Sequence, residues 1–203
     1  MANPTGSFGL KPVRHQDGSP WNGATVRCYI SASYATALFV GDPVLLSPTL
    51  AEKEATGKHP TINASAGTAG TIIKGVITSF EPDPDNLTRT YSPASTAGWA
   101  NVCMGGDVVY EIRGDGGGTI TSVIPGQNAV MIATSAGSTA SGLSGFDLDE
   151  GTTTAPNTTQ NFTLHVTAIT NREDNDLGVN AVYDVLLNTQ DNATGRFLGV
   201  TAA

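Results

Sequence analysis

The sequence predicts an all-β protein, a β-barrel or sandwich of tulip- or jelly-roll-like type with an extended N-terminal arm. Three observations lead to this prediction. β-branched and aromatic residues recur at alternate positions in short runs, and clusters of Gly, Pro and Asn separate these runs. Patterns with the helical period of about 3.6 residues are nearly absent. The chain has 203 residues, enough for one β domain that needs no disulfide or metal to fold.

The predicted strands follow one another from residue 26 to the C-terminal part of the chain. The clearest alternation is in 162–169, where apolar Phe162, Leu164 and Val166 are separated by polar residues. Turn signals stand between the segments, among them Pro125-Gly126. Two segments, 35–39 and 50–56, favour short helical turns that are too short to organise a fold. The predicted strands are 26–30, 44–46, 71–80, 107–112, 119–124, 128–133, 162–169 and 183–187.

Residues 1–25 form a segment distinct from the single β domain predicted for residues 26–203. The segment has no strand or helix period, and it combines prolines and glycines with large apolar side chains. A disordered tail usually lacks large apolar residues, and a packed strand carries few prolines. We therefore expect an extended arm that binds another surface, with an arm folded back on its own domain as the alternative. The residues expected to bind are Phe8, Leu10, Lys11, Val13, Arg14 and Trp21.

A long segment, residues 134–159, is rich in Ser, Thr and Gly. Loops of more than about 15 residues are uncommon unless they are functional or link two parts. The isolated apolar residues Leu143, Phe146 and Leu148 are therefore candidates for a contact between subunits. The alternative is an ordinary surface excursion of the β domain.

Charge is scarce and unevenly distributed. Charged residues make up 14% of the chain, against about 25% in a typical soluble domain. This favours either a surface partly covered by neighbouring molecules or a neutral Thr/Ser surface. Residues 114–203 carry 9 acidic and 2 basic residues, a net charge of −7 out of −8 for the whole chain. Such a region would repel phosphate backbones, so nucleic acid is not an expected partner.

The sequence shows no feature of secretion or membrane insertion. Its first residues lack the apolar stretch of a secretory signal, and no run approaches the ~20 apolar residues that span a bilayer. A membrane is therefore not an expected partner. Cys28 and Cys103 lie in apolar, strand-like segments, so we expect buried free thiols in a protein made in the cytosol.

The sequence contains no recognised catalytic or cofactor-binding signature. Its three histidines lack the spacing of a zinc site, and there is no nucleophile elbow, P-loop or dinucleotide fingerprint. Acidic clusters are the remaining candidates. Asp147, Asp149 and Glu150 have no aromatic platform near them in sequence, and 174–178 lacks ligands of a calcium loop. We expect no catalytic residue, no enzymatic activity, no cofactor and no metal.

Several strings of the sequence together resemble the decoration, or cement, proteins of tailed-bacteriophage capsids. The resemblance covers residues 8–145 and depends on the order of the strings, none of which is a catalytic motif. The strings are FGLKPVRH (8–15), GSPWNG (18–23), ALFVGDPV (37–44), GVITSFEP (75–82) and YSPAST (91–96).

The resemblance implies a β-rich virion protein, made in the bacterial cytoplasm, that binds the outer surface of the capsid and stabilises the shell. Such proteins are often trimers at three-fold positions, and their N-terminal arms commonly pair with capsid strands. The implied partners are the major capsid protein and other copies of the chain, with residues 8–21 as the arm. Three rival functions remain: a head fibre or tail-tube subunit, a carbohydrate-binding β module with exposed aromatic residues, and a hydrolase that uses the acidic loops.

Overall fold

The computed structural model describes residues 3, 5–117 and 125–190, and within them strands dominate, with one 3-10 turn, η1, at Leu50–Glu52. The all-β prediction is confirmed, and most predicted strands are found close to their expected bounds. The predicted strand 119–124 lies outside the described residues. The strands are β1 (Lys11–His15), β2 (Val26–Ile30), β3 (Pro43–Leu46), β4 (Ile62–Ala64), β5 (Gly75–Phe80), β6 (Gly98–Cys103), β7 (Val108–Arg113), β8 (Asn128–Ala129), β9 (Met131–Ala133), β10 (Phe146–Leu148), β11 (Leu164–Ile169) and β12 (Val182–Leu187).

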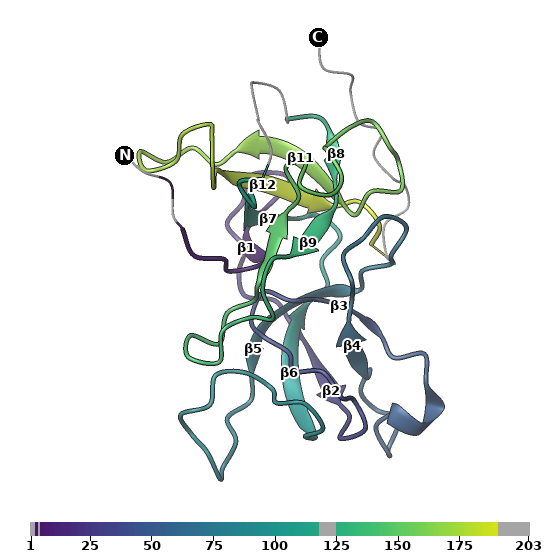
Figure 1. Ribbon diagram of the computed structural model, residues 1–203. Helices are drawn as coiled ribbons and strands as arrows, with labels where there is room; N and C mark the ends of the chain where they lie inside the picture. Colours follow the sequence, from purple (N-terminus) through teal and green to yellow (C-terminus); the bar gives the residue numbers. More distant parts are fainter. Residues whose placement is uncertain (1–2, 4, 118–124, 191–203) are drawn as a thin grey trace.

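The described strands form two five-stranded sheets and a two-stranded ribbon, all antiparallel. The first sheet has the order β1-β7-β12-β11-β8, the second sheet has the order β2-β6-β5-β3-β4, and β9 pairs with β10 in the ribbon. Figure 1 shows the first sheet above the second, with the β5–β6 loop and the η1 region projecting from the lower end. The molecule therefore has two halves that meet at a junction.

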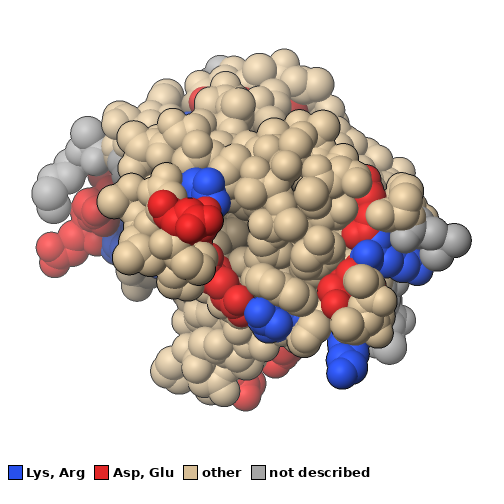
Figure 2. All heavy atoms as spheres, turned by 90° about the horizontal axis from the view of Figure 1, so that it is seen from below, with Lys and Arg blue, Asp and Glu red and all other residues tan. Residues whose placement is uncertain are grey.

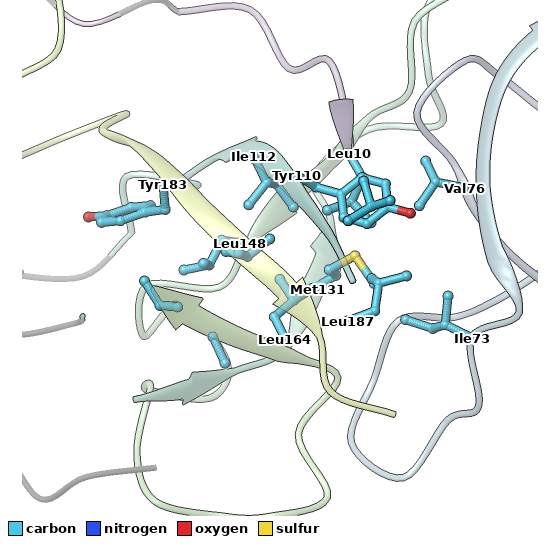
Figure 3. Packing of buried hydrophobic residues seen from close by; sticks show 14 of the residues in the cluster. Leu10, Ile73, Val76, Tyr110, Ile112, Met131, Leu148, Leu164, Tyr183 and Leu187 are labelled. Carbon is cyan, nitrogen blue, oxygen red and sulfur yellow. The ribbon is translucent and has the colours of Figure 1, made fainter. Parts of the chain in front are cut away.

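The first sheet packs one face against the main hydrophobic core (Figure 3). Tyr110 and Ile112 of β7 and Tyr183 and Val185 of β12 contribute to this core at alternate positions of their strands. β7 and β12 are also buried at the positions between, because other segments cover the opposite face of the sheet. Val76, from the second sheet, enters the same core. The main core therefore spans the junction.

The second sheet curls around a smaller core that includes Cys28, Ile30 and Ile77. Its two edge strands approach each other, because Tyr29 N donates a hydrogen bond to Pro60 O at 2.8 Å and β4 begins shortly after Pro60. This half of the molecule is therefore barrel-like. Both cysteines of the chain are free and buried, as predicted.

The N-terminal segment differs from the extended arm that the sequence suggests. Residues Lys11–His15 form β1, an edge strand of the first sheet, and Leu10 lies in the main core at 1% exposure. Earlier in the chain, Thr5 O accepts a hydrogen bond from the Arg113 side chain. The described residues from Leu10 to His15 thus pack on the β domain and do not extend away from it. Pro12 is compatible with β1 because edge strands tolerate proline.

The Ser/Thr/Gly-rich segment 134–159 also contributes to the fold. Phe146–Leu148 forms β10 and pairs with β9. Leu148 is 0% exposed in the main core, and Phe146 packs against that core. Leu148 is therefore not available for a contact between subunits, whereas Leu143 remains 37% exposed. An isolated leucine in a polar sequence can pack in the core of its own domain or contact another molecule, and the sequence does not distinguish the two.

Candidate functional site

An apolar groove with a volume of about 550 Å³ opens at the junction of the two halves. Binding sites for ligands and peptides are concave and mostly apolar, with a few polar groups that orient the occupant. The groove fits this description, and its lining comes from segments that are far apart in the sequence. The apolar lining residues are Phe8, Leu10, Pro12, Trp21, Val40, Ile77 and Leu143.

Backbone hydrogen bonds between four segments hold the walls of the groove in place. Leu10 N donates to Gly41 O at 2.9 Å, and Gly41 N donates to Ile77 O at 2.8 Å. Ser144 N donates to Val40 O at 2.9 Å, which attaches the segment that carries Leu143. The N-terminal segment, the 37–44 region, β5 and the 134–145 region are therefore fastened to one another around residue 41.

Two glycines allow the N-terminal segment to approach this closely. Gly9 and Gly41 have φ angles of +70° and +95°, which side chains disfavour. A Cβ atom on Gly41 would lie 2.3 Å from Phe8 O, and one on Gly9 would lie 2.5 Å from Gly41 O. The glycines of the FGL and VGD strings thus have a packing role in this chain.

The strings that carry the resemblance to decoration proteins form one connected region of the structure. Three of them contribute directly to the junction, and the last is joined to them by an antiparallel bridge between Leu38 and Ser92. The four strings concerned are 8–15, 37–44, 75–82 and 91–96.

The rim of the groove carries two basic and two acidic side chains, Lys11, Arg172, Glu111 and Asp174. Glu111 Oε2 lies 3.8 Å from Lys11 Nζ and 3.5 Å from Arg172 Nη1, and Arg172 Nε lies 3.6 Å from Asp174 Oδ1. Partly exposed ion pairs of this kind each contribute about 0–1 kcal/mol. Because the rim charges balance, the groove favours an apolar, nearly neutral occupant.

Trp21 forms one wall of the groove and packs against the main core. Its backbone N donates to Val13 O at 3.3 Å, in the turn that follows β1. The indole Nε1 is buried and has no acceptor within the described part of the chain. An unpaired buried donor costs about 1–3 kcal/mol. A rearrangement at the groove that supplies an acceptor would recover this cost.

The structure brings together most of the residues that the sequence singles out for binding. Phe8, Leu10, Lys11 and Trp21 of the predicted arm line the groove with Leu143 of the predicted intersubunit loop. In the sequence these residues belong to two separate segments, the predicted arm and the predicted loop. The groove also uses residues that sequence analysis did not select, Val40, Ile77, Arg172 and Asp174 among them. Nothing in the sequence around these residues indicates that they share a site, because the pattern of apolar and polar residues predicts only local structure.

Val13 and Arg14 do not line the groove. Arg14 Nη1 donates to Asp184 Oδ2 at 2.7 Å, and Asp184 Oδ1 accepts from Thr170 Oγ1 at 2.6 Å. The side chain of Asp184 is 9% exposed in this pair. The charge of Arg14 is therefore balanced within the chain.

The acidic group near residue 148 makes internal contacts. Asp147, at 0% exposure, forms a two-pronged ion pair with Arg113, with Nε–Oδ1 at 3.0 Å and Nη2–Oδ2 at 2.6 Å. Ser7 Oγ also donates to Asp147 at 2.8 Å. Asp149 accepts hydrogen bonds from the backbone N of Gly151 at 2.9 Å and of Thr154 at 2.7 Å. These carboxylates therefore accept hydrogen bonds from other parts of the chain and stabilise the local fold.

Glu150 completes this group and is 4% exposed. It accepts a hydrogen bond from the Tyr183 hydroxyl at 2.8 Å and one from Gly116 N at 2.9 Å. Burial raises the pKa of Glu150, and these hydrogen bonds oppose the increase. Among the described residues, no cluster of His, Cys, Asp and Glu has the arrangement of a metal site.

Asp42 is a buried titratable group at the junction. It accepts a hydrogen bond from Phe39 N at 2.8 Å and one from the Ser144 hydroxyl. Burial raises the pKa of Asp42 from 3.8 to about 6, because the surroundings disfavour the charged form. Asp42 therefore links the 37–44 region to the segment that carries Leu143 through a bond that depends on pH.

An aromatic cluster lies on the outer face of the second sheet. The rings of Tyr29 and His59 contact Trp99 edge-on, with centroid distances of 5.2 and 5.0 Å, and the Arg27 guanidinium lies 3.6 Å from the Trp99 centroid. Glu81 in turn binds Arg27 at 2.8 Å. The ring face of Trp99 is thus covered by Arg27. A sugar-binding platform needs an open ring face, so this cluster does not favour the carbohydrate-binding alternative.

Figure 2 shows the lower end of the molecule, where most of the surface is uncharged and acidic and basic residues lie next to each other. The pairs Arg27–Glu81 and Arg89–Asp83 belong to this half of the molecule.

No described helix is long and apolar enough to cross a membrane. Comparisons of the chain with protein-family models, curated proteins and solved structures find no match.

Proposed function

We propose that this chain is a capsid decoration protein that attaches to the outer surface of a phage shell through the groove at its junction. The observation that carries the proposal is the meeting of Phe8, Leu10, Lys11, Trp21 and Leu143 in that groove. The low charge of the chain and the resemblance of its strings to cement proteins support the same function.

The mode of attachment differs from the free arm that the resemblance implies. Because β1 pairs with β7 and Leu10 is buried, residues 8–15 belong to the first sheet and do not form a free arm. A shallow apolar groove can instead receive apolar side chains of a capsid segment, with the charged rim excluding water around them. The expected partners are the major capsid protein and other copies of the chain, assembled as a trimer.

The test is binding to undecorated capsids of the phage that encodes the chain, measured by co-sedimentation. We expect Trp21→Ala to weaken binding more than Lys11→Ala, because a packed aromatic contributes more than a screened surface charge. Leu143→Ser should also weaken binding, whereas Leu87→Ser, at a residue 77% exposed outside the groove, should not. If Trp21→Ala and Leu143→Ser both bind capsids as well as wild type, and circular dichroism shows that both are folded, the proposal is rejected.

The assembly state distinguishes this function from that of a tail-tube or head-fibre subunit. A decoration protein with this function should be a stable trimer in solution by light scattering. A tube subunit should form rings or filaments, because head-to-tail contacts propagate unless the rotation closes. Rings or filaments would favour the tail assignment.

A further inference from the structure

We propose that Asn22 is a site of spontaneous deamidation, at which the side-chain amide becomes a carboxylate next to Trp21 in the wall of the groove. The reaction needs only water and the chain itself. The proposal depends on the residue that follows Asn22, on the exposure of both residues and on the hydrogen bonds around them. It is independent of attachment to a capsid.

The pair Asn22-Gly23 is the only Asn-Gly pair in the sequence. Deamidation begins when the backbone nitrogen of the next residue attacks the side-chain carbon of asparagine. A side chain on that next residue hinders the approach and restricts the backbone, whereas glycine does neither. Every other asparagine of the chain precedes a residue that has a side chain. Asn22 therefore faces the least hindered attacking nitrogen.

The backbone around the pair leaves the reacting atoms accessible. Both residues are exposed, and they lie between β1 and β2 in a segment without strand or helix. Gly23 has a φ of +82°, and no atom lies within 4 Å of the position that a Cβ would take. Among the described residues, Gly23 N and Asn22 Nδ2 have no hydrogen-bond partner that would hold them back.

One hydrogen bond of the segment favours the attack. Asn22 Oδ1 accepts a hydrogen bond from Ala24 N at 3.1 Å. This turn folds the asparagine side chain back along its own backbone, and Gly23 N is part of the ring that the hydrogen bond closes. The same N–H points at the oxygen on which negative charge develops when Cγ is attacked, so it stabilises the transition state.

The reaction balances without any oxidant or reductant. Gly23 N forms a bond to Asn22 Cγ, the bond from Cγ to Nδ2 breaks, and Nδ2 leaves as ammonia with the proton from Gly23 N. The product is a cyclic succinimide. Water then adds to one of its two carbonyl carbons and opens the ring. Opening at one carbonyl gives aspartate, and opening at the other gives isoaspartate, whose main chain continues through the side-chain carbons.

The two Asp-Gly pairs of the chain are poorer sites for the same ring closure. An ionised carboxylate resists attack by a nucleophile, and hydrogen bonds from Ser19 lower the pKa of Asp17 and so favour its ionised form. Asp115 Oδ1 accepts hydrogen bonds from Gly117 N and from Glu150 N, both at 3.1 Å, which hold the side chain in place. The neutral amide of Asn22 has neither restriction.

Deamidation at residue 22 changes the groove in two ways. A negative charge is added beside a rim whose charges otherwise balance. In the isoaspartate form, one additional carbon also enters the main chain directly after Trp21, which packs against the main core. We expect the chain to leave Trp21 in a different direction, and the indole to become more accessible to water.

Peptide mapping of the full-length chain tests the site. After incubation at mildly alkaline pH, the peptide that contains residue 22 should gain the mass difference between O and NH and should accept a methyl group from an isoaspartyl methyltransferase. Asn86 is the internal control, because it is also exposed but precedes Leu87. The modified fraction at Asn22 should exceed that at Asn86 severalfold, and Asn22→Gln should abolish it. Equal fractions at the two asparagines, or an unmodified Asn22, overturn the proposal.

Acrylamide quenching of Trp21 in a Trp99→Phe background tests the effect on the groove. Quenching should increase as the isoaspartate fraction rises, and it should stay constant in the Asn22→Gln variant under the same incubation. Asn22→Asp carries the charge on an unaltered main chain, so it separates the two contributions. Modification without a change in quenching would overturn the effect on the groove wall. Neither measurement uses capsids, so this proposal and the proposed function fail separately.

Discussion

Arg113 and Asp147 hold three parts of the chain together through single side chains. Arg113 lies on β7, Asp147 on β10, and both bind the segment that precedes β1 through Ser7. The side chains are 8% and 0% exposed, so neither charge is compensated by bulk water. Loss of one partner leaves the other charge buried and unpaired, which is the costly case for an internal ion pair.

Arg113→Met should therefore destabilise the protein by about 3–5 kcal/mol, measured as the free energy of unfolding in urea. The matched variant Arg27→Met removes a pair whose side chains are 41% and 36% exposed, and should change the stability much less, because exposed ion pairs contribute little. Arg113→Met combined with Asp147→Leu should recover much of the loss, because both charges are then absent. Equal effects of the two single variants would contradict this account.

Asp42 should make stability depend on pH in the direction opposite to an ordinary salt-bridged carboxylate. Its pKa is about 6 in the folded protein and near 3.8 when exposed, so the folded state binds more protons between these values. The stability from this group is present at low pH and is lost as pH rises through about 6. Relative to Asp42→Asn, wild type should gain roughly 2 kcal/mol between about pH 7 and about pH 4.5. Urea titrations of both proteins at each pH check this, and a constant difference would refute it.

At the scale of elements, β1 shows how local pattern and tertiary structure can disagree. Its sequence, KPVRH, carries a proline and two basic residues and does not alternate as a buried strand does. The strand forms because β7 offers an unpaired edge and because Leu10 enters the main core just before β1 begins. A strand that forms because of a long-range pairing need not show alternating apolar residues in its own sequence, and β1 does not.

Gly41→Ala tests the close approach between the N-terminal segment and the junction. Alanine should cost about 1–2 kcal/mol for its left-handed backbone and a further ~1–3 kcal/mol for the clash of its Cβ with Phe8 O. Gly18→Ala is the control, because Gly18 has a similar φ of +90° and open space around the added Cβ. Thermal unfolding of the two variants separates conformational cost from crowding, and equal shifts would show that the contact adds nothing.

The strands in which apolar and polar residues alternate were predictable from the sequence. For the groove, the sequence indicated several of the lining residues but not that they lie together. β2, β7, β11 and β12 repeat apolar residues at every second position, which the sheets require. The groove instead combines Phe8, Trp21 and Leu143 across the fold, and the sequence alone cannot tell an arm that binds outward from one that packs inward. Leu148 illustrates the difficulty, since it is an internal anchor in a polar segment.

At the scale of the whole molecule, the two halves share a core. Ile73, Val76 and Cys103 belong to the second sheet and its entry, yet they pack in the main core with the first sheet. Cooperative unfolding depends on such shared burial, because neither half can lose its contacts without exposing the other. Two separate sheets therefore do not imply two separate folding units.

The two tryptophans report on the two halves and test this cooperativity. Trp21 packs against the main core, and Trp99 lies on the second sheet. We expect the unfolding curves of Trp21→Phe and Trp99→Phe, each followed by the remaining indole, to have the same shape and to coincide with circular dichroism after correction for stability. Separated transitions would indicate that the halves unfold independently.

The fold-back of the N-terminal segment has a mechanical consequence. A tension applied at Asn3 first loads its hydrogen bonds with Asp176 and Val179. It then reaches residues 5 and 7, which the side chains of Arg113 and Asp147 hold as a clamp before β1 begins. Beyond that clamp, β1 runs antiparallel to β7 along five residues, so a pull along the strand loads its hydrogen bonds together in shear. The described N-terminal segment should therefore resist a pull along the strand more than a pull that opens its contacts one at a time.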